Sequence, residues 1–155
     1  MNTELYDELA ATSLFEGLED VTLERVASFS AVRRFTDGQK VLSEHADDGY
    51  RTLYLLREGR LNLAKAPSAE QFDSPVNLAT IDEEVYGEVS WLLGRRPSAE
   101  LTSIGDSRLL VVDGEELFAL CEEDPSVGFL IMFRLASMLS MRLVNATQQA
   151  AQQSA

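Results

Sequence analysis

The segment PSVGFLIMFRLASMLSMRLVNATQQ, at residues 125–149, constrains the fold more than any other stretch. Asp124-Pro125 predicts a helix start, because proline is tolerated in the first helical turn. The apolar residues of this helix lie on more than one face, whereas a surface helix of a globular domain needs a single apolar stripe. One face can pack on the chain's own core, and the other needs a second partner. We therefore expect a homodimer through residues 126–144.

Many short strand signals precede this helix. Glu58-Gly59 breaks one apolar run, and a polar loop spans residues 66–75. Strands are predicted around residues 41–42, 53–56, 61–63, 76–81, 99–104 and 108–112. Short strands at close spacing are typical of an antiparallel roll or barrel.

Helices are predicted on both sides of the strands. Residues 3–29 hold two helices, and we expect Asp20 to cap the second. Asp113 and Glu116 form a capping arrangement for a short hinge helix ahead of the long one. The predicted fold is mixed α+β: an antiparallel β-roll (double-stranded jelly roll) flanked by N-terminal helices and by a C-terminal hinge helix and a long dimerisation helix.

Length and charge limit the possible functions. The chain has 155 residues, 45% of them hydrophobic, which predicts one domain over residues 1–148 and a disordered tail at residues 149–155.

A net charge of -13 repels nucleic acid, and no DNA-reading module follows the last helix, so we expect no DNA binding. We find no continuous apolar run of about 20 residues, so we expect no membrane span. The acidic N-terminus is unlike a signal peptide, which predicts a cytoplasmic protein.

The chain is poor in the residues that catalysis and metal binding usually need. Its single cysteine, Cys121, excludes an internal disulfide and a cysteine zinc cluster. Its single histidine, His45, disfavours a histidine metal centre and removes the usual general base. We interpret His45 as a surface residue and expect no metal, no cofactor and no enzymatic activity. The lone histidine also argues against a β-roll metal enzyme of the cupin type.

The order of elements resembles the cyclic nucleotide-binding domain family, which includes the sensor modules of catabolite-activator-type regulators and of kinase regulatory subunits. Fragments across almost the whole chain carry the resemblance. SLFEGLEDVTLERVASF is similar to the opening helices, FTDGQKVL to a strand turn, and LYLLREGRLNL to a strand pair with Gly59 at its hairpin. YGEVSWLLG is similar to the start of the phosphate-binding cassette, and ELFALCEEDPSVGFLIMFRLASMLSMRL to the hinge and dimer helices.

The resemblance implies a ligand site in the cassette. Gly87 allows the backbone to approach a ligand closely. The helix that follows, through Glu88 and Val89, points amides toward an anion. In the family, the glutamate that Glu88 matches accepts hydrogen bonds from the ribose hydroxyl. Small residues, here Ser98 and Ala99, donate backbone amides to the cyclic phosphate.

The sequence departs from the family pattern at the arginine that pairs with the cyclic phosphate. That position falls on Pro97, which has neither a charge nor an N–H donor. Arg96 and Arg95 lie one and two places earlier, and either could reach the phosphate only along a different loop path. A solvated pair of charges in a loop is the other interpretation. Glu83 and Glu84 bring further negative charge close to the cassette.

Two functions from different classes remain open. The resemblance implies a stand-alone regulatory domain that senses cyclic AMP, another cyclic nucleotide or a related anionic ligand. It would signal through its C-terminal helices to a protein partner that the sequence does not identify. The alternative is a degenerate domain that has lost nucleotide binding and acts as a dimeric interaction module. The change at Pro97 predicts that cyclic AMP binds weakly or not at all.

Overall fold

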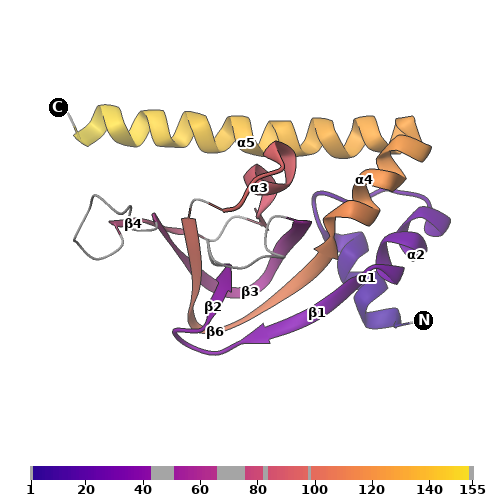
Figure 1. Cartoon of the computed structure of the whole chain (residues 1–155), viewed down its shortest axis with the longest axis horizontal. Helices are drawn as coiled ribbons and strands as arrows, with labels where there is room; N and C mark the ends of the chain where they lie inside the picture. The colour runs from indigo at the N-terminus through magenta and orange to yellow at the C-terminus, as the bar shows by residue number, and fades with distance from the viewer. Residues whose placement is uncertain (1, 43–50, 66–75, 82–83, 98, 154–155) are drawn as a thin grey trace.

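The computed structural model describes residues 2–42, 51–65, 76–81, 84–97 and 99–153 (Figure 1). The elements in chain order are α1 (Thr3–Ala11), α2 (Asp20–Ser28), β1 (Ser30–Phe35), β2 (Lys40–Leu42), β3 (Thr52–Lys65), β4 (Val76–Ile81), β5 (Val85–Tyr86), α3 (Glu88–Leu93), β6 (Ala99–Asp113), α4 (Gly114–Glu123) and α5 (Pro125–Gln153). An antiparallel sheet followed by a long C-terminal helix confirms the predicted mixed α+β fold.

The six strands form one antiparallel sheet in the order β1-β6-β3-β4, with β2 paired to β6 and β5 paired to β3. β6 is central, because Val112 lies opposite both Ser30 of β1 and Leu53 of β3. The strands curve into a roll, and α5 runs across the molecule on one side of it (Figure 1). The short helix α3 lies between the roll and α5, and this places the predicted cassette next to the long helix.

Two strands are longer than the sequence predicts. β3 is continuous over 14 residues and β6 over 15 residues, where we expected two short strands each. Gly59 is therefore not at a hairpin but inside β3, with φ of 95°, and the register shifts between Glu58 and Arg60, which flank it. A Cβ atom there would lie 2.5 Å from the carbonyl oxygen of Asp106 on β6. The glycine allows the two strands to bend together at a bulge, and the ladder continues past it.

The core has two parts, one on each side of the sheet. The larger part joins the N-terminal helices to α4, α5 and one face of the strands, with Phe15, Leu53, Leu117 and Ile131 all fully buried. The smaller part fills the inside of the roll. Its buried members are Phe35, Val41, Leu42, Tyr54, Leu56, Leu61, Tyr86, Leu101 and Leu109.

The helix starts confirm one predicted cap and correct another. Asp113 accepts hydrogen bonds from the amides of Glu115 (2.9 Å) and Glu116 (3.1 Å), as a cap of α4 should. Asp20 does not cap α2 but is its first residue. The carboxylate of Asp20 instead accepts a hydrogen bond from the hydroxyl of Tyr6 at 2.7 Å, which raises the pKa of Tyr6 to about 12.

Helix α5 packs on the domain along one face of its N-terminal half. Gly128, Ile131 and Leu135 are buried there. Arg134 donates hydrogen bonds to the carbonyl oxygens of Leu14 (3.1 Å) and Glu16 (2.7 Å), which lie between α1 and α2. The helix continues to Gln153, so residues 149–153 are helical where the sequence predicted a disordered tail.

By length and composition alone, α5 could also cross a bilayer. A window of 18 residues in it has a mean hydropathy of 1.7, and 17% of that window is buried. The core helix of a globular domain can pass the same test, so the expectation that the chain has no membrane span stays a prediction. One face of the helix is nevertheless docked on the domain through buried residues and Arg134.

Candidate functional site: the cassette and its contact with the long helix

The predicted cassette begins where β5 ends. β5 pairs with β3, with Tyr86 opposite Tyr54, and Gly87 follows as the N-cap of α3 in the left-handed conformation. A Cβ atom on Gly87 would lie 2.6 Å from the carbonyl oxygen of Thr52 and 3.4 Å from the ring of Tyr54. The position needs glycine for two reasons, a positive φ of 83° and a close approach to β3. Burial raises the pKa of Tyr54, which fits its place beneath the cassette.

Glu88 is the residue whose role the resemblance predicts most specifically, and the structure places it against α5. Its side chain is 7% exposed, and its Oε1 atom lies 2.5 Å from Nη1 of Arg142. Arg142 also donates to the carbonyl oxygen of Val85, and its guanidinium lies 5.6 Å from the centre of the Tyr86 ring. One arginine of the long helix therefore binds both the cassette glutamate and the strand that leads into the cassette.

A second contact links the cassette helix to the hinge helix. The indole nitrogen of Trp91 on α3 donates to the carbonyl oxygen of Gly114, the first residue of α4, at 2.8 Å. A Cβ atom on Gly114 would lie 2.7 Å from the Trp91 ring and 2.5 Å from the carbonyl oxygen of Arg51. A displacement of α3 would therefore act on the start of α4.

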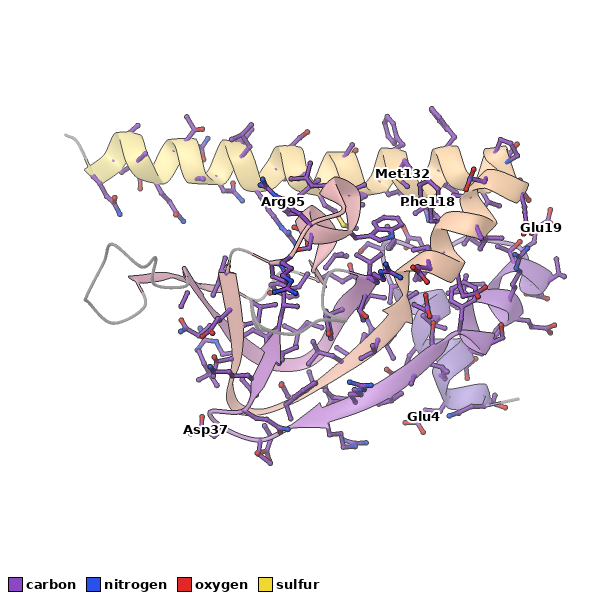
Figure 2. All side chains as sticks on the ribbon, in the orientation of Figure 1. Glu4, Glu19, Asp37, Arg95, Phe118 and Met132 are labelled. Carbon is purple, nitrogen blue, oxygen red and sulfur yellow. The ribbon has the colours of Figure 1, made fainter. Side chains whose placement is uncertain are left out.

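The remaining predicted site residues follow α3. Val89, Arg95 and Arg96 are exposed, and Figure 2 labels Arg95, which follows the end of α3. The amide of Arg95 donates to the carbonyl oxygen of Ser90 at 3.2 Å, which fixes the backbone at the end of the helix. Pro97, which stands at the position that the resemblance gives to the arginine, is buried. Its side chain carries no charge.

Ala99 is the first residue of β6, directly after the cassette loop. Ser98, Glu83 and His45 lie outside the described residues. The predicted roles of Ser98 and Ala99 as amide donors, and of His45 as a surface residue, therefore remain predictions.

Glu84 does not face the cassette as an isolated negative charge. Its Oε1 atom accepts a hydrogen bond from the amide of Ser13 at 2.9 Å and lies 3.8 Å from a guanidinium nitrogen of Arg57. The carboxylate that we expected to repel an anionic ligand is thus partly compensated. Within the described part of the chain, no group of three or more His, Cys, Asp and Glu side chains could hold a metal ion.

Sequence reasoning did not identify Arg142 as a site residue. A signal was nevertheless present, because residues 125–153 contain only two charged side chains, Arg134 and Arg142, in a chain that is 25% charged. A charge kept in an otherwise uncharged helix indicates a specific partner. The partner itself, 54 residues away, could not be read from the sequence.

Comparisons with known proteins agree on the fold. No protein-family model matches the chain. No curated protein matches it significantly. Among solved structures, a cyclic nucleotide-binding domain from Methylobacillus flagellatus KT aligns over 97% of this chain and 80% of its own, with a TM-score of 0.73 and 18% identity. The catabolite activator protein of Thermus thermophilus aligns over 92% of this chain and 63% of its own, with a TM-score of 0.66 and 26% identity.

The regulatory domain of Toxoplasma gondii PKA, solved with cAMP, aligns over 87% of this chain and 49% of its own, with a TM-score of 0.67 and 16% identity. Two of these three structures are named as binding or regulatory domains, and the third as an activator. The roll, the helix order and these alignments together show that the chain has the fold of cyclic nucleotide-binding domains.

Proposed function

We propose that the protein is a regulatory, non-enzymatic cytoplasmic domain that senses a cyclic nucleotide or a related anionic ligand and signals through its C-terminal helices. The observation that carries the proposal is the pairing of Glu88 with Arg142, because it joins the predicted ligand residue directly to α5. A ribose hydroxyl that bonds to Glu88 would change the surroundings of Arg142. The Trp91 contact with Gly114 provides a second route, from α3 to the hinge helix.

The proposal includes a homodimer along the exposed face of α5. Seven exposed residues recur at alternating spacings of four and three, which is the pattern of a coiled-coil seam. These seam residues are Phe129, Phe133, Ala136, Ser140, Leu143, Thr147 and Ala150. The rings of Phe129 and Phe133 stack with their centres 6.0 Å apart, and their side chains are 72% and 60% exposed.

The lack of charge along the seam allows a second copy of this chain to bind there. Two molecules that each carry -13 repel one another over most of their surfaces. The seam residues are all uncharged, and both arginines of α5 bind their own domain instead. Depletion of charge is a mark of the core of a protein interface. Two copies could therefore meet along this face without burying a charge.

A second candidate function is a dimeric interaction module that binds no nucleotide. One observation favours it: Pro97 stands at the position that the resemblance gives to the phosphate-binding arginine. A calorimetric titration with cyclic AMP and cyclic GMP separates the two functions. The sensor predicts weak but saturable binding that Glu88→Gln removes. Absence of binding by the natural protein would favour the interaction module.

Substitution at Pro97 tests whether the cradle is otherwise intact. Pro97→Arg should raise the affinity for cyclic AMP by roughly 10- to 150-fold, because hydrogen bonds to charged groups contribute about 1.5–3 kcal/mol. Pro97→Gln is the matched control, since it frees the backbone in the same way and adds no charge. Equal binding by the two variants would show that an arginine at position 97 does not reach the phosphate. Absence of binding by both would show that the pocket is closed to nucleotides and would contradict the sensor function.

A further inference from the structure

A pocket of about 410 Å³ lies beside α5, on a different side of the helix from the seam. Three segments that are far apart in the sequence line it: the N-terminal region, the residue before β5, and the second half of α5. The lining residues are Ser13, Glu84, Ser137, Met138, Met141, Arg142 and Asn145. Among the five that come from α5, residues 137 and 141, 138 and 142, and 141 and 145 lie four positions apart, so the five share one broad side of the helix. None of them is a seam residue.

The lining is apolar with a few polar groups at its rim. Met138 and Met141 supply flexible, polarisable surface that adapts to the shape of a ligand. The hydroxyl of Ser137 donates to the carbonyl oxygen of Phe133 at 2.8 Å, which leaves its oxygen to accept a hydrogen bond. The side chains of Ser13 and Asn145 are exposed at the rim.

The two charged members of the lining are each compensated by neighbouring groups. Arg142 binds Glu88. Glu84 accepts from the amide of Ser13 and lies 3.8 Å from a guanidinium nitrogen of Arg57. The pocket therefore presents no net charge to a ligand. Together with the charge of -13 on the chain, this disfavours an anion such as a nucleotide.

We propose that this pocket is a second ligand site, which takes a small uncharged molecule with an apolar body and one hydrogen-bond donor. The methionines contact the body, and the carboxylate of Glu84 or the oxygen of Ser137 accepts from the donor. The volume is within the range of about 300–1,000 Å³ that small-molecule sites occupy. Because Glu84 precedes β5 and Met138 lies on α5, a bound molecule would hold α5 against the domain. The pocket shares Arg142 with the contact to Glu88, but its test needs no nucleotide.

The test uses the protein labelled with ¹³C at its methionine methyl groups and indole as the probe. The chain has four methionines, which are Met1, Met132, Met138 and Met141. Indole should shift the methyl signals of Met138 and Met141 in a saturable way with one shared dissociation constant. The signal of Met132, which does not line the pocket, should stay in place. Methylation of the indole nitrogen removes the donor, so 1-methylindole should bind about 2- to 10-fold more weakly.

A pair of leucine substitutions on α5 locates the binding site. Ser137 lines the pocket, whereas Gln148 is exposed on the same helix and belongs neither to the pocket lining nor to the seam residues. Ser137→Leu should fill the pocket and remove the shifts, whereas Gln148→Leu should keep them. If Ser137→Leu fails to fold, Asn145→Leu takes its place. The proposal is overturned if indole causes no saturable shift, if 1-methylindole binds as tightly as indole, or if the pocket-filled variant responds like the natural protein.

Discussion

Arg142 of α5 and Glu88 of the cassette form an ion pair at 2.5 Å across 54 residues of sequence, and the glutamate is 7% exposed. A buried carboxylate is stable only with a partner that satisfies it. The same arginine binds the carbonyl oxygen of Val85, so its loss would leave two acceptors without their donor. The position of α5 and the state of the cassette are therefore linked through one side chain.

Arg142→Ala should lower the free energy of unfolding by about 1.5–3 kcal/mol, the usual contribution of hydrogen bonds to charged groups. Chemical denaturation followed by circular dichroism measures it. Arg95→Ala is the control, because Arg95 is exposed at the end of α3, and surface substitutions of this kind stay within about 0.5 kcal/mol. In the background of Glu88→Gln, Arg142→Ala should cost less. Additive effects of the two substitutions would show that the pair is not coupled.

Substitution of the two glycines that flank α3 distinguishes backbone strain from steric collision. Gly87 and Gly94 both have positive φ, but only Gly87 has an atom within reach of a new Cβ, the carbonyl oxygen of Thr52 at 2.6 Å. Gly94→Ala should cost about 1–2 kcal/mol of strain alone. Gly87→Ala should cost roughly 1–3 kcal/mol more, because the side chain is overpacked. Equal losses of stability would mean that β3 moves away from the cassette easily.

The sequence predicts the architecture well because its strongest patterns are local. A helix with two apolar faces, a cap at Asp113 and glycines at turns each depend on residues within a few positions of one another. The continuity of β3 past Gly59 depends instead on the approach of Asp106 from β6, which no local pattern contains.

The difference between local patterns and contacts of distant segments also applies to the candidate site. Gly87 and Glu88 could be proposed as ligand residues from a local motif that resembles the family's, and their role stays a prediction. The partner of Glu88 on α5 could not, because contacts between distant elements depend on how the elements pack.

The dimer prediction can be tested with one added charge at two places on α5. Ser140→Glu places a carboxylate on the seam, so a two-fold dimer would bury two unpaired negative charges there. Gln148→Glu adds the same charge at an exposed position outside the seam residues. Light scattering at micromolar concentration should give a monomer for Ser140→Glu and a dimer for Gln148→Glu and the natural protein. A natural protein that stays monomeric on concentration would refute the dimer.

Arg108 makes the stability depend on pH. It pairs with Glu8 and, at 2.9 Å, with Glu58, and this contact holds the pKa of Glu58 below its ordinary value. A carboxyl group with a lowered pKa in the folded state stabilises the protein above its unfolded pKa, about 4.3 for glutamate. That contribution is lost as the pH falls through the lower, folded pKa.

Glu58→Gln should therefore reduce the melting temperature at pH 7, and the difference from the natural protein should shrink as the solution becomes acidic. Thermal unfolding over a pH series measures this. Glu122→Gln is the control, since Glu122 is exposed on α4 and has no ion pair among the described residues. A difference that stays constant down to acidic pH would assign the effect of Glu58 to packing rather than to its charge.

The most direct test of the account is whether a nucleotide in the cassette changes the surroundings of α5 near Arg142. The methionine methyl spectrum reports this, because Met138 and Met141 lie beside Arg142 and Met132 lies about two turns earlier on the helix. Cyclic AMP at concentrations that saturate binding, as judged by calorimetry, should shift the signals of Met138 and Met141 and leave Met132 in place. Shifts that persist in Ser137→Leu would assign the effect to the cassette rather than to the second pocket. Saturated binding with an unchanged spectrum would contradict the proposed coupling between ligand and helix.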